Sequence, residues 1–388
     1  MNINDLLNKV ASIIIEKRNY CSFSQQKEFL DKQAIPTNLV ENSYNQYKSQ
    51  MYLQGKFFWF LANASSWVIY PLIMLINKNN KLHSITNKDA IFNCYDIDKE
   101  ILPNSLKSKY PNIYMNEKME GFFIDDDIRK FKKIYMKKYK YSRYFYLKCI
   151  MKLCYFNYLI KKYRPKAIIG YSEFTFTSSI LTEYCNYLNV KHINIMHGEK
   201  KFNIRDSFCS FNEFYVWSDL YEELFLSLKC QANFIKELPP MFLWNAECKS
   251  TSIDFTYYLT NPCESKMIEI INLLDKLVES GKSVAVRPHP RYTNKKFLKK
   301  ICNSNIEIED SNKISIRESI VRTKYIVSDF STVLLQGLYA KKQIVIDDVT
   351  DPKLFNQMVD LKYGIVYKKE NYIKLSTLLK GMNINEIY

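Results

Sequence analysis

The second half of the chain alternates short apolar segments with longer helical segments, and no other feature of the sequence constrains the fold as strongly. The apolar segments span residues 255–259, 283–287, 306–309, 325–327 and 343–346, and the helical ones include 264–280, 316–321 and 331–340. Strands that alternate with helices in this way belong to βαβ units, which form parallel sheets. The sequence therefore predicts a doubly wound, Rossmann-like α/β domain over residues 250–370.

A second Rossmann-like domain is predicted over residues 1–245. Strands are expected at 90–93, 166–170, 190–196 and 213–216, helices from about 175 to 188 and from Asp219, and further helical segments over 1–85 and 125–163. Regular patterning is lost over 238–252, where we place the domain boundary, and 388 residues are enough for two cores. A C-terminal helix over 371–388 is expected to pack back on the first domain.

Composition limits the class of function. The formal net charge of +16 favours anionic partners, which include nucleotides, acidic glycans, anionic lipids and nucleic acid. Ten cysteines without a CxxC pair, together with only four histidines, argue against a zinc site and favour reduced thiols. The N-terminal segment lacks the pattern of a secretory signal. We therefore expect a cytoplasmic protein with no metal or other cofactor, and no nucleic-acid-binding module is recognisable.

Two segments are candidates for membrane contact. Residues 57–76 are apolar and, at about 1.5 Å per residue, long enough for a bilayer core of roughly 30 Å, although Asn63, two serines and Pro71 interrupt them. A membrane span, a contact with the membrane surface and a buried helix pair are the alternatives. Residues 129–143 hold eight Lys and Arg among aromatic residues, which is typical of a solvated helix face or of a surface for an anionic membrane or polyanionic acceptor.

Polar residues follow three of the predicted strands in the second half. They are Thr260, Asn261 and Pro262 after the first strand, Arg287, His289, Pro290 and Arg291 at the end of the second, and Ser328, Asp329, Ser331, Thr332 and Gln336 at and after the fourth. Ligands of parallel sheets bind at the carboxyl ends of the strands. We therefore expect these loops to share one pocket.

The chemistry of these loops suits a nucleotide phosphate. Ser331 and Thr332 begin a helix directly after a strand, where hydroxyls and free N–H groups can hold a phosphate. A plain helix N-cap is the alternative. Arg287 and His289 can donate to the same phosphate, and a capping or core role is the alternative for the histidine. We interpret the loops together as a donor-binding site.

Transfer to an acceptor hydroxyl also needs a base, because the pKa of such a hydroxyl is far above neutrality. Glu173, in the loop after a predicted strand, is the first candidate, and His197, with Glu199, in the next such loop is the second. Glu173 preceding a helix and His197-Gly198 forming a turn are the structural alternatives. The run Asp125–Asp127 could be a metal-binding DxD motif, but acidic residues also stabilise a helix N-terminus, which is the reading we expect.

The loop motifs resemble those of a known family. Thr260-Asn261-Pro262, His289-Pro290-Arg291 and Ser328-Asp329-x-Ser331-Thr332 are similar to the C-terminal domain of bacterial GT-B sialyltransferases and polysialyltransferases, over about residues 255–348. The resemblance implies a GT-B fold, in which His289, Pro290, Ser331 and Thr332 hold the CMP phosphate. The acidic pair that precedes a glycine in that family is absent, since Met119 precedes Glu120-Gly121. His197-Gly198, RPHP and SDxST also resemble the CDP-glycerol glycerophosphotransferases and the capsular Kdo transferases.

On this resemblance, we expect an inverting, metal-independent glycosyltransferase with its nucleotide-sugar cleft between two Rossmann-like domains. It would transfer sialic acid or another nonulosonate from a CMP-activated donor to a glycan or glycolipid acceptor of capsule or lipooligosaccharide, at the inner face of the cytoplasmic membrane. Transfer of Kdo, or of glycerol phosphate from CDP-glycerol, is the alternative among enzymes. A basic α/β protein that binds a membrane or nucleic acid is the alternative outside enzymes, because a fold alone does not establish an activity.

Overall fold

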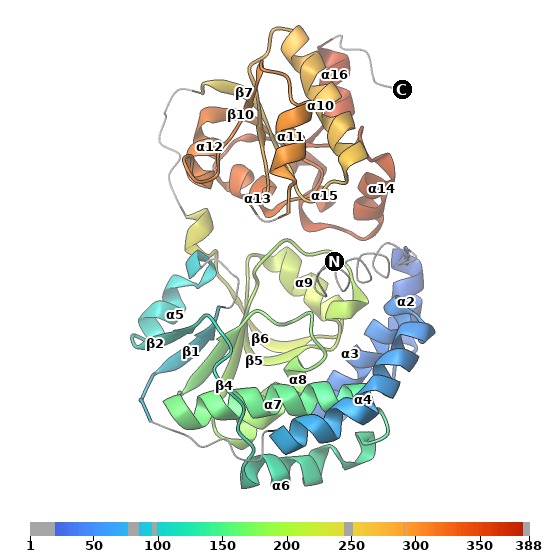
Figure 1. The fold of residues 1–388 in the computed structure, drawn as a ribbon, viewed down its shortest axis with the longest axis vertical. Coiled ribbons are helices and arrows are strands. Elements are labelled where there is room, and N and C mark those ends of the chain that lie inside the picture. The colour runs from blue at the N-terminus through green and yellow to red at the C-terminus, as the bar shows by residue number, and fades with distance from the viewer. Residues whose placement is uncertain (1–19, 77–84, 95–98, 244–250, 291, 383–388) are drawn as a thin grey trace. The chain divides into compact units, whose positions relative to one another are not determined.

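The structure, a computed structural model, describes residues 20–76, 85–94, 99–243, 251–290 and 292–382 (Figure 1). The chain divides into two compact units. The first holds Met1–His197 and Phe202–Leu238, and the second holds Gly198–Lys201 and Pro239–Tyr388. The division at Leu238 lies inside the segment that we marked as the domain boundary. The short segment Gly198–Lys201 groups with the second unit, which no pattern in the sequence had indicated.

A six-stranded parallel sheet forms the centre of the first unit. Its strands are β1 (Ala90–Asn93), β2 (Ile113–Asn116), β3 (Ala167–Gly170), β4 (Lys191–Ile195), β5 (Ser210–Val216) and β6 (Gln231–Lys236), in the order β2-β1-β3-β4-β5-β6. Ile168 of β3 pairs with Ile91 on one side and His192 on the other. The predicted strands β1, β3, β4 and β5 are confirmed. β2 and β6 were not predicted, because both are partly exposed edge strands without the continuous apolar run of a buried strand.

Helices pack around this sheet (Figure 1). Those described are α2 (Phe23–Asp31), α3 (Leu39–Gln54), α4 (Lys56–Ile76), α5 (Asn104–Lys109), α6 (Asp126–Tyr135), α7 (Arg143–Tyr163), α8 (Ser178–Tyr187) and α9 (Asp219–Ser227), with 3-10 turns η2 (Lys99–Ile101), η3 (Lys137–Tyr139) and η4 (Ile204–Asp206). Side chains cap several of them; the Ser22 hydroxyl accepts from the Gln25 N–H at the start of α2. The helical segment predicted over 125–163 is two helices, α6 and α7, with η3 between them.

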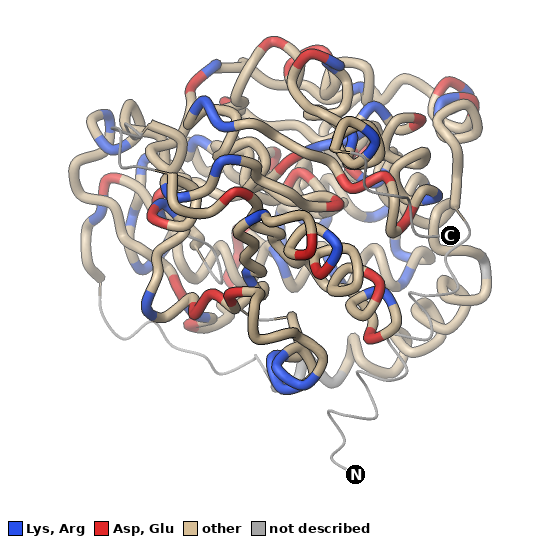
Figure 2. The backbone as a smooth tube through the Cα atoms, turned by 90° about the horizontal axis from the view of Figure 1, so that it is seen from above, with Lys and Arg blue, Asp and Glu red and all other residues tan. Residues whose placement is uncertain are grey.

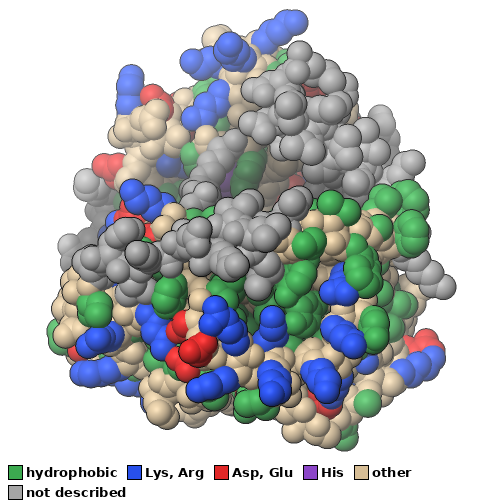
Figure 3. Space-filling view, turned by 60° about the horizontal axis from the view of Figure 1, so that its bottom comes forward, with side chains coloured by type: hydrophobic (Ala, Val, Ile, Leu, Met, Phe, Trp, Pro, Cys, Tyr) green, Lys and Arg blue, Asp and Glu red, His purple; other side chains and the backbone are tan. Residues whose placement is uncertain are grey.

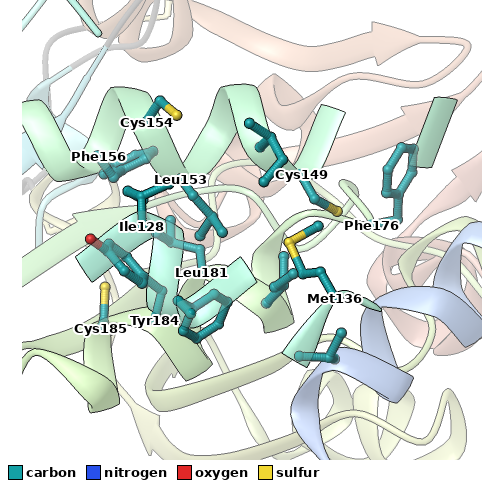
Figure 4. Packing of buried hydrophobic residues seen from close by; sticks show 14 of the residues in the cluster. Ile128, Met136, Cys149, Leu153, Cys154, Phe156, Phe176, Leu181, Tyr184 and Cys185 are labelled. Carbon is teal, nitrogen blue, oxygen red and sulfur yellow. The ribbon is translucent and has the colours of Figure 1, made fainter. Parts of the chain in front are cut away.

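The core of the first unit involves α7 and α8. Figure 4 shows side chains of α7, among them Cys149 and Leu153, gathered with Leu181 and Tyr184 of α8. The buried Tyr184 hydroxyl donates to Asn157 Oδ1 at 2.8 Å, so its polar group is satisfied inside the core. Each fully buried apolar side chain of this kind stabilises the fold by about 1.5–3 kcal/mol. This packing fixes the strand ends from which the loops at residues 171–177 and 196–203 begin.

The second unit is built on another six-stranded parallel sheet. Its strands are β7 (Ile253–Tyr258), β8 (Val284–Arg287), β9 (Ile306–Ile308), β10 (Thr323–Ser328), β11 (Gln343–Ile346) and β12 (Ile373–Lys374), in the order β12-β11-β10-β7-β8-β9. Its helices are η5 (Pro240–Phe242), α10 (Glu264–Glu279), α11 (Lys295–Ile301), α12 (Ile316–Arg322), α13 (Thr332–Tyr339), α14 (Pro352–Asp360), α15 (Gly364–Tyr367), η6 (Lys369–Asn371) and α16 (Leu375–Gly381). The five predicted strands are confirmed, and so is the predicted class of two Rossmann-like α/β units.

The C-terminal helix α16 packs within the second unit, which corrects the expectation that residues 371–388 return to the first. Leu375 and Leu379 lie in the hydrophobic core together with Phe255 and Leu274. β12 directly precedes α16 and pairs with β11, so the edge of the sheet positions the helix. Residues 383–388 lie outside the described residues.

Candidate functional site

The strand order of the second sheet reverses between β7 and β10. From β7 the chain runs outward through β8 and β9, then returns to the other side of β7 and continues through β10, β11 and β12. In doubly wound sheets, ligands bind at such a reversal, outside the carboxyl ends of the strands. The loops that follow β7 and β10 begin at Leu259 and Asp329, so two of the predicted polar loops meet at this point.

Asp329 connects these two loops. Its carboxylate accepts hydrogen bonds from Thr260 Oγ1 at 3.1 and 3.2 Å, from the Phe330 N–H at 2.7 Å and from Lys266 Nζ at 3.2 Å. Lys266, on α10, also lies 3.4 Å from Asp351. Burial acts to lower the pKa of Lys266, but the charges of both aspartates outweigh it and the pKa is raised. Because its oxygens are used in this way, Asp329 holds the loops together rather than facing a phosphate.

Ser331 and Thr332 begin α13 at the same reversal. Ser331 is the N-cap, and its hydroxyl accepts from the Val333 N–H at 3.3 Å. Gly198 lies close by, since a Cβ at that position would be 3.8 Å from Thr332 Oγ1. The positive end of the α13 dipole, two partly exposed hydroxyls and a neighbouring glycine therefore lie together, and such an arrangement suits a phosphate.

The segment Gly198–Lys201 is held in the second unit by α15. The Lys200 carbonyl accepts from the Gly364 N–H at 3.0 Å. Glu199 lies near Tyr363: burial, and after it the Glu199 charge, raises the pKa of this phenol. We expected Glu199 beside the two base candidates, but the structure groups it with the donor loops of the second unit.

Arg287 points into the protein and is already paired. Its guanidinium donates to Glu309 at 2.7 Å and to the Ile314 carbonyl at 2.9 Å, and the residue is 8% exposed. Glu309 also accepts from Arg322 at 2.8 and 3.2 Å and from Ser319 at 2.9 Å. The phosphate role that we assigned to Arg287 is therefore corrected, because its charge belongs to a buried network of β8, the residue after β9, and α12.

His289 remains a candidate in the loop after β8. It is partly exposed, and its ring stacks on Tyr292 with the centroids 4.5 Å apart. Its backbone N–H donates to Thr293 Oγ1 at 2.8 Å, which fixes the turn. Because β8 pairs with β7, this loop is next to the strand-order reversal, and the exposed Pro290 follows in it. Arg291 lies outside the described residues.

The remaining predicted donor residues differ in accessibility. Ser328 is completely buried, and its hydroxyl donates to the Tyr258 carbonyl at 2.8 Å, so it ties β10 to β7 instead of facing a ligand. Gln336 lies within α13 and is 9% exposed. Asn261 is exposed and Pro262 is half-buried. Of these four, Asn261 is the one most accessible to a donor.

Glu173, in the first unit, is completely buried. Its Oε2 accepts from Asn194 Nδ2 at 3.0 Å, and its backbone carbonyl accepts from Gln46 Nε2 at 2.7 Å. Its Oε1 lies 3.3 Å from His197 Nδ1. A carboxylate with no exposed atom cannot take a proton directly from a bound acceptor. Glu173 is therefore not placed to be the base that we expected first.

His197 is the exposed member of this pair. Its side chain is 26% exposed, and the rings of Tyr171 and Phe174 lie beside it at centroid distances of 5.0 and 5.7 Å. The His197 Nδ1 atom faces Glu173 Oε1 but is not aligned to hydrogen-bond with it. A proton on Nδ1 leaves the Nε2 lone pair free to accept another proton. The arrangement can therefore serve as a partly exposed imidazole base beside a buried carboxylate.

The acidic run Asp125–Asp127 begins α6. Asp125 is the N-cap and accepts from the Ile128 N–H at 3.1 Å, and Asp127 pairs with Lys161 at 2.5 Å. In the part of the chain that the structure describes, no three His, Cys, Asp or Glu side chains are grouped as a metal site would require. These contacts fit the interpretation of Asp125–Asp127 as the start of a helix.

Two residues of these sites, Lys266 and Asn194, were not predicted. Lys266 gave no signal, because one lysine at the start of a surface helix looks like many others in this basic chain. Asn194 also holds the Ser172 N–H, through its Oδ1 at 2.7 Å. It could have been found, since it is a polar residue inside the otherwise apolar end of β4 and therefore needs a buried partner.

Comparisons with known proteins give similarities of fold at low identity. No family model and no curated protein matches the sequence. The chain is similar to the UDP-GlcNAc 2-epimerase of Methanocaldococcus jannaschii in complex with UDP-GlcNAc and UDP, with 13% identity and a TM-score of 0.42 over 77% of this chain and 92% of that chain. It is also similar to S. aureus MnaA with UDP, with 10% identity and a TM-score of 0.42 over 74% of this chain and 89% of that one. For the wall teichoic acid polymerase TagF, the identity is 12% and the TM-score 0.39, over 81% and 80% of the two chains. At these values the similarities carry no argument about the activity of this chain.

Proposed function

We propose that this chain is a GT-B glycosyltransferase that uses a nucleotide-activated sugar and needs no metal. The observation that carries the proposal is the convergence of Thr260, Ser331, Thr332 and Gly198 where the strand order of the second sheet reverses. The hydroxyls of Ser331 and Thr332 at the start of α13 suit the phosphate of a nucleotide, and Thr260, bonded to Asp329, ties the neighbouring loop to them. The donor that we propose is a CMP-linked nonulosonate such as sialic acid, on the resemblance of the three loop motifs. The proposed acceptor is a surface glycan or glycolipid.

The proposed reaction is an inverting displacement. His197 Nε2 takes the proton of the acceptor hydroxyl while the hydroxyl oxygen attacks the anomeric carbon of the donor. The bond between that carbon and the nucleotide phosphate oxygen breaks. The hydroxyls of Ser331 and Thr332, with the α13 dipole, stabilise the charge that develops on the leaving phosphate. Glu173 positions the imidazole and stabilises the imidazolium that forms.

The burial of Glu173 favours a second candidate donor. The sialyltransferase resemblance relies on a carboxylate base, whereas the His197-Gly198 motif belongs to the resemblance to Kdo transferases and CDP-glycerol glycerophosphotransferases. Transfer of Kdo or glycerol phosphate is therefore the second candidate. Both candidates release a cytidine nucleotide, so both require the same phosphate site.

Cytidine nucleotides are expected to raise the melting temperature of the protein in a thermal-shift comparison of CMP, CDP, UDP and GDP. A ligand at 100 times its Kd adds about 2.7 kcal/mol to the free energy of unfolding. Hydrolysis assays with CMP-sialic acid, CMP-Kdo and CDP-glycerol then separate the two candidates, and turnover is expected to persist in EDTA. If no nucleotide stabilises the protein, the alternative of a non-enzymatic binding protein is favoured.

Ser331→Ala is expected to weaken binding of the cytidine nucleotide by about tenfold or more, since a hydrogen bond to a charged group contributes about 1.5–3 kcal/mol. Ser315→Ala is the matched control, because Ser315 caps α12 in the same unit by accepting from the Glu318 N–H at 3.2 Å. Both variants lose an N-cap, at a cost of about 1 kcal/mol in stability. Calorimetric titration measures the affinities. Equal affinities of the two variants would contradict the phosphate role.

A further inference from the structure

One face of α4 is apolar and exposed. The exposed side chains are Phe57 (76%), Phe60 (70%), Leu61 (49%), Trp67 (53%), Val68 (64%) and Ile69 (42%). Positions 57, 60, 61 and 68 follow the 3.6-residue period of one helix face. The segment 57–76 contains no charged residue. The helix therefore presents an exposed apolar stripe. Such a patch on a protein surface marks a site of contact with another molecule or with a membrane.

The opposite face of α4 is fixed to the rest of the first unit. Trp59 is 2% exposed and packs edge-on against Tyr47 of α3, with the ring centroids 4.7 Å apart. Asn63 Oδ1 accepts from the Tyr144 N–H of α7 at 3.1 Å. Ser66 is buried, and its hydroxyl donates to the Ala62 carbonyl at 2.6 Å. The face of α4 that packs against the core is therefore this opposite face, and the apolar stripe is a separate, exposed face.

Basic side chains lie next to this stripe. The Arg143 guanidinium lies 3.5 Å from the Trp67 ring, which joins the start of α7 to the exposed face of α4. Just before Arg143, an open cavity of about 550 Å³ is lined by Asn38, Ile134, Tyr135, Lys137, Lys138, Lys140 and Tyr141. Lys138 pairs with Glu41 at 2.5 Å. Among the described residues, no carboxylate pairs with Lys137 or Lys140, so positive charge is available at this cavity.

The local arrangement is more informative than the total charge. Figure 2 shows Lys and Arg along most of the chain with Asp and Glu interspersed, so the net charge by itself marks no single face. Figure 3 views the side on which Figure 1 draws α4, α6 and α7, and there hydrophobic side chains gather beside Lys and Arg. No helix among the described residues is both long and apolar enough to cross a bilayer.

We propose that the exposed face of α4 and the lysine-lined cavity together form a docking surface for an anionic lipid bilayer. The apolar side chains of α4 enter the interfacial region, and Lys137 and Lys140 bind lipid phosphates. A bilayer combines an apolar interior with anionic headgroups, which matches both parts of this surface. A second copy of the chain would bring the same unpaired lysines toward one another, so it fits the charges less well. The inference does not depend on the proposed sugar transfer.

Vesicle flotation with the full chain tests the proposal. Wild type is expected to bind vesicles of phosphatidylcholine mixed with phosphatidylglycerol, to bind phosphatidylcholine alone more weakly, and to be released by salt. Phe60→Ser/Val68→Ser is expected to reduce binding by about tenfold or more, because it removes apolar side chains from the lipid interface. Lys137→Glu/Lys140→Glu is expected to reduce binding by about tenfold or more, because it reverses two charges that face lipid phosphates. All these positions are exposed, so melting temperatures close to wild type are expected and separate lost binding from lost folding.

Two control variants change the same residue types elsewhere. Leu226→Ser/Val359→Ser alters side chains that are 54% and 49% exposed, and Lys299→Glu/Lys300→Glu reverses exposed charges on α11. Both are expected to bind anionic vesicles as wild type does. Wild type that does not bind, or α4 variants that bind equally well, would overturn the proposal. It is also overturned if Phe60→Ser/Val68→Ser leaves vesicle binding unchanged and alters only the oligomeric state, measured by light scattering.

Discussion

His197→Ala is expected to lower kcat by about 10²–10⁴-fold while the affinity for the cytidine nucleotide stays near that of wild type. The imidazole is the partly exposed member of the His197–Glu173 pair, so it is the group able to receive the acceptor proton. In the proposed function the nucleotide binds loops of the second unit, and this substitution in the first unit does not alter them. Steady-state kinetics with the donor that the hydrolysis assays identify, and calorimetric titration with its nucleotide, measure the two quantities.

Glu173→Gln is the informative companion of this variant. It keeps the size of the side chain and an oxygen for Asn194, but it removes the charge beside His197. Because Glu173 acts through the imidazole, we expect a smaller loss of kcat than in His197→Ala, and the double variant is expected to be no slower than His197→Ala. If Glu173→Gln is inactive and His197→Ala is not, the carboxylate is the base. If neither loses activity, the proposed chemistry is wrong.

Glu309→Ala is expected to destabilise the second unit by about 3–5 kcal/mol. Glu309 is 1% exposed and is the common acceptor of Arg287 and Arg322. Its removal leaves the nearly buried Arg287 guanidinium without its anionic partner, and an uncompensated buried charge is costly. Urea unfolding followed by circular dichroism measures the loss.

Glu307→Ala provides the matched control for this substitution. Glu307 also pairs with Arg322, at 2.5 Å, but its side chain is 41% exposed. Water and salt screen such a pair, so we expect a loss of about 1 kcal/mol or less. If the two variants lose stability equally, burial of the Glu309 network does not govern its energy.

The strands and helices that were predicted correctly show which local patterns are sufficient to assign secondary structure from one sequence. Strands β7, β8 and β10 were predicted because each is an apolar run of strand length between helical segments. β2 and β6 were not predicted, because at a sheet edge a strand is half-exposed and its composition resembles that of a loop. The helical segment 125–163 was predicted as helical, but the turn η3 between α6 and α7 was not, since Lys and Tyr residues continue through it.

For the candidate site, the sequence likewise predicted the positions of loops but not the orientations of their side chains. A polar loop after a strand is visible in the sequence, and this placed Thr260, Ser331 and Thr332 at the strand-order reversal. Whether a particular side chain turns toward a ligand is not visible, because it depends on which charges lie across the sheet. Arg287 meets Glu309, which is 22 positions later in the chain, and so turns inward. The exposed stripe of α4 was open to three interpretations for the same reason.

Local patterns by themselves determined the two α/β halves of this protein, the positions of most strands and the polar loops that follow strands of the second half. They could do so because strand and helix periodicity, helix capping and turn composition reflect interactions between residues that are near in sequence. Only the tertiary structure decided the strand orders, the grouping of Gly198 with Thr332, the inward pairing of Arg287 and the burial of Glu173 behind His197. Each of these depends on residues that are distant in the chain and meet only when the sheets and helices pack, and burial then determines which charged groups remain accessible.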